Sequence, residues 1–303
     1  MAFASSLLMA YVANDDRRLL RTAFSRDGLN WVNAKFIEGQ TSNTAPSVAV
    51  LRNEVVMAYV AHDESHSLLT TSSPDGITWA PSRTVEQRSA TAPALAAIAD
   101  HLVMIYVAKG FANELTVALS IDGIDWIDPR PLMAPGSRGL FSLPSGSAPA
   151  FAFLAAQNLL VIAYVAEGAH DNVFVAVSDG GDIWDGPIPV GVSSKFAPAL
   201  VVADDELVMA YVSNTPGNEL MTLGTRDVSD WGRPRPIVGQ SSKDSPALRV
   251  TENEILLAYV ANNERNSLLT AASADGIAWT RSRPAAGESS KSPPSLCFPT
   301  PLI

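Results

Sequence analysis

Residues 42–87 read SNTAPSVAVLRNEVVMAYVAHDESHSLLTTSSPDGITWAPSRTVEQ, and this stretch decides the fold. It contains four short apolar segments, PSVAV, EVVMAYVA, SLLTTSS and ITWAPSRTV, which are separated by Asn, Asp, Gly, Pro and Ser. β-Branched and aromatic residues favour strands, whereas the separating residues favour turns. No helical period competes with this pattern. The stretch therefore predicts four consecutive β-strands.

The same unit recurs along the whole chain. Its tyrosines follow one another at spacings of 48, 47, 58, 47 and 48 residues, and its tryptophans repeat those spacings. The repeated residues are Tyr11, Tyr59, Tyr106, Tyr164, Tyr211 and Tyr259, and Trp31, Trp79, Trp126, Trp184, Trp231 and Trp279. Four strands in about 48 residues are typical of one blade of a β-propeller. Every Tyr and Trp is thus a repeat position, and we expect all of them to pack the blades.

The two ends of the chain complement each other across the repeat boundary. The C-terminal SPPSLCFP matches the first-strand segment TAPSVAVL, whereas the N-terminus begins near a second strand, SSLLMAYVA. We therefore expect residues 295–298 to form the innermost strand of the blade whose other strands come from residues 5–40. Such closure leaves no unpaired gap in the ring. The sequence predicts an all-β fold, a six-bladed propeller with four antiparallel strands per blade, as one domain over residues 1–303.

Composition excludes several classes of function. Of the 303 residues 47% are apolar and 17% charged, and the formal net charge is -10, so we expect a globular chain without the basic surface that nucleic acids or anionic membranes require. Cys297 is the single cysteine, which excludes an internal disulfide and a Cys-rich metal site. We expect neither a metal nor a cofactor.

The N-terminal MAFASSLLMAYVA lacks the basic region of a signal peptide and repeats downstream, so it is expected to be a strand. No apolar run is long enough for a transmembrane helix. These features predict a cytoplasmic protein, or one secreted without a classical signal peptide.

The turns between the third and fourth predicted strands share one pattern. They read SRDGLNW, SPDGITW, SIDGIDW, SDGGDIW, TRDVSDW and SADGIAW. The pattern resembles the Asp-box, or BNR repeat, of sialidase-type propellers, S-x-D-x-G-x-x-W, with one residue fewer between Asp and Gly. The fourth copy shifts its Asp to Asp179, and the fifth has Val228 in place of Gly. The resemblance, which extends to sugar-binding propellers, implies a structural turn on the face opposite the binding site.

The same resemblance argues against sialidase chemistry. Sialidases use a tyrosine nucleophile paired with an acid, together with three arginines that hold the substrate carboxylate. Here every tyrosine occupies a repeat position and is expected to be part of the packing. The resemblance therefore implies the architecture without the activity.

Function is expected where the repeats differ from one another. An insertion at residues 134–147 lengthens the third repeat and is expected to bring Arg138 and Phe141 onto the loop face. It is either a tolerated surface insertion or a lid or wall over the central funnel. Arg249 stands in a first strand where the other repeats carry Ala49, Ala96, Ala152, Val201 and Cys297. A charge there must face the axial channel or be paired, so Arg249 is either a ligand contact or half of a structural pair.

The loops that join second to third strands, and those that lead into first strands, supply further candidates. His62, His66 and His170 are either solvated or take part in metal binding or proton transfer. A repeated Ser-Ser-Lys places Lys195, Lys243 and Lys291 at equivalent positions, where they are either solvated or form equivalent binding sites between blades. The candidate acid and base carboxylates are Asp63, Glu167, Asp171 and Asp244.

Two classes of function fit these features. The first is a lectin-like binding protein that recognises a glycan or small polar molecule on the loop face or in the central funnel, with Arg249, Arg138, Phe141, His62, His170, Glu167, Lys195, Lys243 and Lys291 as candidate contacts. The second is an enzyme with one site in the funnel, a glycosidase, a lyase or a small-molecule biosynthetic enzyme, where Phe141 and Phe196 would suit an apolar substrate. The unequal repeats favour one axial site over many.

Overall fold

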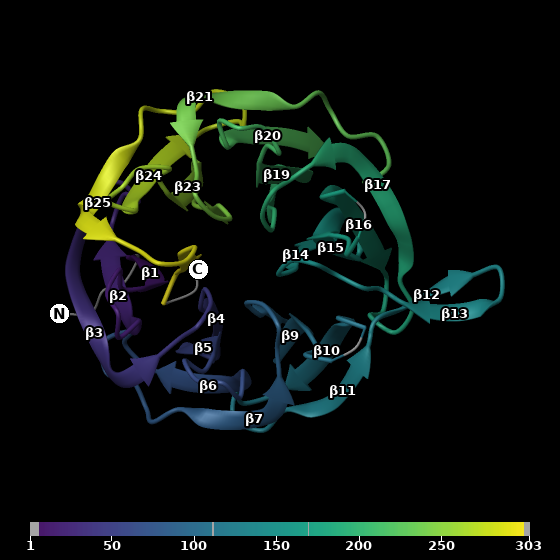
Figure 1. Cartoon of the computed structure of the whole chain (residues 1–303), viewed down its shortest axis with the longest axis horizontal. Helices are drawn as coiled ribbons and strands as arrows, with labels where there is room; N and C mark the ends of the chain where they lie inside the picture. The colour runs from purple at the N-terminus through teal and green to yellow at the C-terminus, as the bar shows by residue number, and fades with distance from the viewer. Residues whose placement is uncertain (1–5, 111, 169, 300–303) are drawn as a thin grey trace.

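The computed structural model describes residues 6–110, 112–168 and 170–299. Six four-stranded antiparallel sheets surround a central axis like the blades of a propeller (Figure 1). The predicted all-β, six-bladed fold is thereby confirmed. Residues 1–5 of the predicted N-terminal strand segment and residues 300–303 at the C-terminus lie outside this description. In the part that is described, no helix has the length and apolarity to span a membrane.

The strands of each blade run in order from the axis to the rim, and we number the blades 1 to 6 from the N-terminus. The inner strands are β26 (Ser295–Cys297), β4 (Ser47–Leu51), β8 (Ala94–Ile98), β14 (Ala150–Leu154), β18 (Ala199–Ala203) and β22 (Ala247–Val250). The second strands are β1 (Leu7–Val12), β5 (Glu54–Val60), β9 (His101–Val107), β15 (Leu159–Val165), β19 (Glu206–Val212) and β23 (Ile255–Val260).

The third strands are β2 (Leu19–Ser25), β6 (Ser67–Ser73), β10 (Leu115–Ser120), β16 (Asn172–Ser178), β20 (Glu219–Thr225) and β24 (Ser267–Ser273). The outer strands are β3 (Trp31–Thr41), β7 (Arg83–Arg88), β11 (Ile127–Pro131), β17 (Asp185–Ser193), β21 (Arg235–Ser241) and β25 (Arg283–Ser289). A hairpin of β12 (Met133–Gly136) and β13 (Gly139–Ser142) and a 3-10 turn, η1 (Ala155–Gln157), complete the described elements.

One predicted strand begins later than expected. The segment ITWAPSRTV predicts a strand from Ile77, but β7 begins at Arg83. Pro81 has no amide N–H to donate to a ladder, and the preceding Ala80 closes the turn by donating its N–H to Ser72 O, 2.9 Å away. The chain therefore joins the sheet only after the proline.

The core consists of apolar clusters that lie between neighbouring blades. Each of the six clusters contains one of the repeated tyrosines and packs against one of the repeated tryptophans. Trp31 and Trp184 are buried, whereas the other four indoles are half-buried. Burial raises the pKa of Tyr106 to about 12. These residues hold the blades together, as their repeated positions predict.

The chain crosses from one blade to the next through a serine in the pattern S-x-x-x-P. In every blade its hydroxyl donates to the carbonyl two residues later and to a carbonyl at the end of the second strand, and its exposed fraction is at most 1%. These serines are Ser42, Ser89, Ser145, Ser194, Ser242 and Ser290. The Ser of Ser-Ser-Lys that adjoins the lysine is therefore a structural residue.

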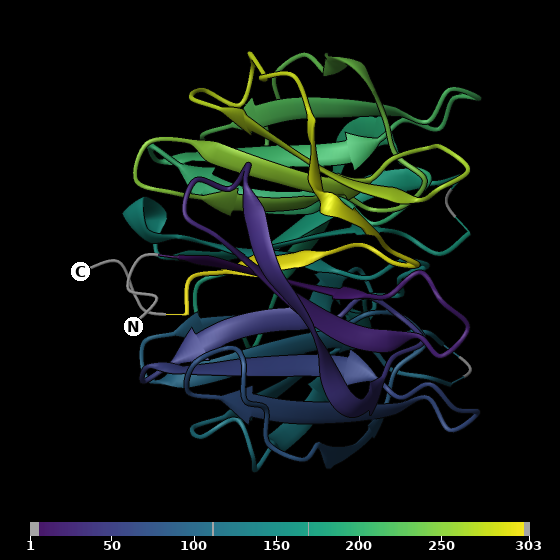
Figure 2. The ribbon, with the colours of Figure 1, turned by 90° about the vertical axis from the view of Figure 1, so that its left-hand side faces the viewer.

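The ring closes between the two ends of the chain. The C-terminal β26 pairs with β1 through Leu8 and Cys297, Met9 and Leu296, and Ala10 and Ser295. Figure 2 shows this C-terminal strand in yellow beside the purple N-terminal segments. The closing strand expected at residues 295–298 is confirmed, because β26 is the innermost strand of blade 1.

Candidate functional site

The axis of the propeller holds a cavity of about 1200 Å³. Its wall is built from the six inner strands and from the segments that lead into and out of them. Because each inner strand has no partner on its axial side, its edge presents backbone N–H and C=O groups that no neighbouring strand pairs. The cavity therefore combines small apolar side chains with a large supply of main-chain donors and acceptors.

The charged residues of this wall are unequally distributed. Four are basic and two acidic, namely Arg52, Lys195, Arg249 and Lys291, and Asp100 and Asp244. Arg249 is the one charged residue within the six inner strands, all of which the structure describes. The other five lie in the segments at the two ends of the strands. An acidic protein thus encloses a cavity whose formal charge is positive.

Arg249 lies on β22 opposite Leu256. Its guanidinium carbon is 5.5 Å from the centroid of the Phe298 ring, which follows the closing strand β26. The buried Nε has no hydrogen-bond partner, and no ion pair of Arg249 occurs within the described residues. Burial lowers the pKa of Arg249, with a smaller opposing effect from the nearby Cys297. Within the described residues Arg249 is therefore not half of a structural ion pair.

Asp244 lies in the segment that enters β22. Its Oδ1 accepts a hydrogen bond from the Ser245 amide at 2.8 Å. Burial raises the pKa of Asp244 to about 6, although the hydrogen bonds from Ser245 act in the opposite direction. The other blades carry uncharged residues at this place, Thr44, Thr91, Ser147, Phe196 and Ser292. Asp244 is therefore a carboxyl group whose pKa of about 6 lies just below neutral pH.

The insertion does not reach this cavity. The β12–β13 hairpin projects from the outer rim between blades 3 and 4 (Figure 1), and Arg138 and Phe141 are exposed on it. Of the two alternatives for the insertion, the hairpin is a surface insertion at the rim and not a lid or wall over the funnel. Leu132 and Leu143 are buried between the two blades, and they hold the base of the hairpin at the rim. Apolar anchoring at the outer edge directs the hairpin away from the axis.

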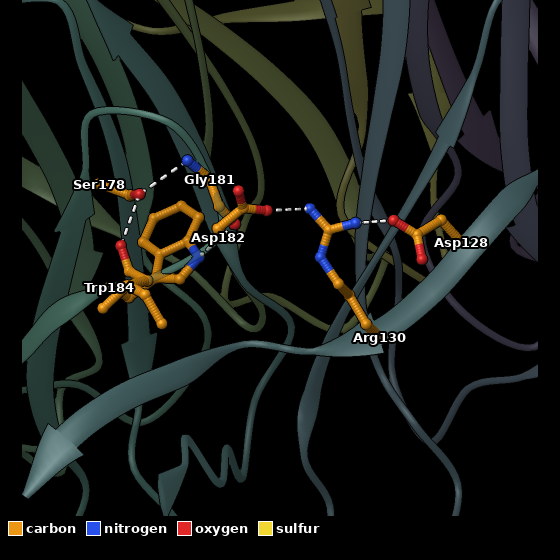
Figure 3. Close-up of polar contacts among 7 residues, drawn as sticks. Asp128, Arg130, Ser178, Gly181, Asp182 and Trp184 are labelled. Atoms are coloured by element: carbon orange, nitrogen blue, oxygen red, sulfur yellow. Dashed lines mark hydrogen bonds and ion pairs between the residues drawn. The ribbon is translucent and has the colours of Figure 1, made fainter. Parts of the chain in front are cut away.

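A charged contact also fixes this outer region (Figure 3). Arg130 on β11 bonds Asp128 of its own strand and, at 2.6 Å, Asp182 in the turn of blade 4. In that turn the Ser178 hydroxyl accepts from the Gly181 amide and donates to the Ile183 carbonyl. The divergent fourth turn thus binds the neighbouring blade through Asp182, and Arg130 has a structural partner on each side.

The loop candidates lie away from the cavity. His62, His170 and Glu167 are exposed, and Glu167 accepts a hydrogen bond from Asn113 at 3.0 Å. No group of three potential metal ligands occurs over residues 6–110, 112–168 and 170–299. The structure therefore does not bring these side chains together with Arg249.

The three lysines of the Ser-Ser-Lys series are partnered within their own blades. Lys195 and Lys243 donate to the side-chain oxygens of Asn218 and Asn266, at 3.2 and 2.6 Å. Lys291 lies 4.0 Å from a carboxylate oxygen of Asp16. Lys195 and Lys291 also border the axial cavity. The lysine thus recurs because in each of these blades it contacts the loop between the second and third strands.

The sequence predicted Arg249 as an axial residue, and the structure places it in the wall of the cavity, whereas Asp244 was only one of four candidate carboxylates. The signal for Asp244 is its position directly before the Ser-Pro that enters an inner strand, where no other blade has a charge. An alignment of the six repeats therefore shows that only this blade has a charge at this position. The charge indicates a cavity residue only once the entering segments are known to line the cavity.

No family model and no curated protein sequence matches this chain. Solved structures do resemble it. The Aleuria aurantia lectin in complex with Fucα1-6GlcNAc has a TM-score of 0.67 and 15% identity, covering 94% of either chain. A Burkholderia pseudomallei lectin has a TM-score of 0.65 and 15% identity, covering 92% of this chain and 95% of the lectin. An α-L-arabinofuranosidase of Fusarium graminearum has a TM-score of 0.67 and 13% identity, covering 88% of either chain. At these identities the likeness shows a shared propeller fold.

Proposed function

We propose that this chain is a lectin-like propeller that binds one glycan, or a polar molecule of similar size, in its axial cavity. The observation that carries the proposal is the cavity of about 1200 Å³ with Arg249 as the one charged side chain on its inner strands. A guanidinium offers a fork of donors, and its charge-assisted hydrogen bonds are stronger than those between neutral groups. The whole chain serves as one propeller domain, and its six turns act as Asp-box-type structural turns.

The chemistry of the wall supports a ligand rich in hydroxyl groups. Main-chain N–H and C=O groups on the inner edges can donate to and accept from sugar hydroxyls. Small residues such as Ala96 and Ala152 on the inner strands leave the space open, while Phe298 provides an apolar surface near the guanidinium. Two lectins share the fold, and one of them was solved with a fucosylated sugar.

The alternative is an enzyme with its site in the same cavity, and Asp244 favours it. A carboxyl group with a pKa of about 6 suits proton transfer near neutral pH. Hydrolysis of a glycoside usually needs two carboxyl groups flanking the scissile bond. Asp100, the other acid of the wall, follows β8, whereas Asp244 precedes β22, so they lie toward opposite ends of the inner strands. This separation favours binding over glycoside hydrolysis.

Calorimetric titration with hits from a glycan array tests the proposal. We expect one ligand per chain, with binding lost in Arg249→Ala while the melting temperature changes by only a few degrees. The control replaces residues 135–140 by Asn-Gly, which shortens the hairpin to a two-residue turn. It should leave the affinity unchanged because the hairpin lies at the rim. Several equivalent ligands per chain, insensitive to Arg249→Ala, would contradict an axial site.

A further inference from the structure

The inner strands carry a positive charge that the described protein does not neutralise. Five blades place Ala49, Ala96, Ala152, Val201 and Cys297 at this position, so Arg249 is not required by the repeat. Its Nε is buried without a hydrogen-bond partner, and the residues described provide no carboxylate within ion-pair distance. The Arg249 residue is half-buried, and a partly desolvated charge without a counter-charge would gain free energy from an anion in the cavity.

The surroundings of Arg249 agree with this reading. Four basic and two acidic residues line the cavity, although the whole chain has a formal net charge of -10. A cleft whose lining has an excess of one sign of charge attracts ions of the opposite sign. Asp244, in the segment that enters the same strand, accepts its hydrogen bond from the Ser245 amide and not from Arg249. The guanidinium is thus left for a ligand, with the Phe298 ring beside it.

We propose that the ligand of the axial cavity carries a carboxylate that pairs with the Arg249 guanidinium, as a uronic acid residue of a glycan would. This inference rests on the proposed function of the cavity and specifies the chemistry of its ligand. The planar fork of a guanidinium matches the two oxygens of a carboxylate. A neutral sugar would leave the charge unpaired, whereas an anionic one neutralises it.

Matched pairs of ligands provide the first test. Glucuronate and galacturonate are titrated against glucose and galactose in the full-length protein by calorimetry. We expect the uronates to bind about tenfold more tightly or better, in line with the strength of charged hydrogen bonds. Arg249→Gln should abolish that preference. Arg235→Gln, which removes an exposed positive charge on the outer strand β21, should retain it. Melting temperatures of both variants establish that they fold.

The outcomes separate the two proposals. If one ligand binds per chain but uronates are not preferred over neutral sugars, the carboxylate inference is wrong and the axial site is unaffected. The same holds if the preference for uronates survives Arg249→Gln. Several ligands per chain would contradict both proposals.

Bromide provides a probe that does not depend on the sugar. Crystals soaked in bromide should show anomalous density beside Arg249 in the wild type and none there in Arg249→Gln. A wild-type crystal without that density would also overturn the inference.

Discussion

Gly28 shows how a single residue of the repeated turn serves the packing of two blades. Its φ of +69° favours glycine, and a Cβ added there would lie 2.2 Å from Leu256 Cδ1 on β23 of blade 6. Gly76 makes the same close approach to Leu8 of blade 1. The repeated glycine therefore has two causes, a left-handed backbone and a neighbouring blade that occupies the place of a side chain.

Substitution separates these two causes. Gly39 on β3 has a φ of +70° with no atom within 4 Å of an added Cβ. Gly39→Ala should therefore lower the free energy of unfolding only by the strain of the left-handed backbone, about 1–2 kcal/mol. Gly28→Ala should cost roughly 1–3 kcal/mol more because of overpacking against Leu256. Urea unfolding of the two variants measures the difference. If both variants lost the same free energy of unfolding, the side chain of Leu256 would accommodate the added methyl group without strain.

The aspartates of the turns have lowered pKa values, which link them to the dependence of stability on pH. Burial alone would raise the pKa of Asp27, but hydrogen bonds from the amides of Asn30 and Leu29 outweigh it and lower that pKa to about 2. Hydrogen bonds also lower the pKa of the corresponding aspartates Asp75, Asp122, Asp227 and Asp275. A pKa that is lower in the folded state stabilises the fold above the unfolded value, here 3.8, and the stabilisation disappears as the pH falls through the folded value.

Melting temperatures between pH 6 and pH 2 test this dependence. The wild type should lose stability below about pH 4 as the turn carboxylates take up protons. Asp27→Asn should be less stable at pH 6, and the gap to the wild type should narrow toward pH 2. Asp179→Asn is the control, since Asp179 makes no amide hydrogen bonds of this kind in the described structure. A gap for Asp27→Asn that stays constant with pH would refute the role of the carboxylate charge.

Among the elements, the short closing strand joins the two ends of the ring. β26 pairs with β1 over three residues, and the Ser290 hydroxyl before it donates to the Val12 carbonyl at 2.9 Å. Phe298 and Leu296 pack in the cluster that joins blades 1 and 6. Without this strand, β1 would become an exposed edge with buried-type side chains on both faces.

Deleting residues 290–303 should therefore lower the melting temperature cooperatively or cause aggregation. Differential scanning calorimetry and size-exclusion chromatography measure the two effects. The matched control is the hairpin variant with Asn-Gly in place of residues 135–140, because it removes a comparable edge element that closes nothing. A truncated chain that stays monomeric with an unchanged melting temperature would show that the ring does not depend on β26.

For the whole molecule, the arrangement of charge sets the axis apart from the surface. The chain carries an excess of acidic residues, but Arg249 is the one charged residue on the six inner strands. The partnered lysines and the Arg130 contacts show that other prominent cations are used between or within blades. Asymmetry among the repeats is therefore structural at the rim, and at the axis we propose that it serves ligand recognition.

The architecture could be read from the sequence because it is repeated and local. Each repeat carries its own strand and turn pattern, and the segment around Leu296 matches the inner strands of other repeats, so the blade number and the ring closure follow without tertiary information. The axial position of Arg249 follows in the same way, since an inner strand must line the channel of a propeller. A pattern that recurs six times averages out the ambiguity of any single segment.

Tertiary packing alone decided where the divergent segments lie. The insertion at 134–147 has no counterpart in the other repeats, and its direction depends on the burial of Leu132 and Leu143 between two neighbouring blades. The raised pKa of Asp244 likewise depends on its burial in the folded chain. Periodicity specifies which residues share a place in the blade. The direction of a loop and the solvation of a charge are determined by contacts between blades, which no single repeat contains.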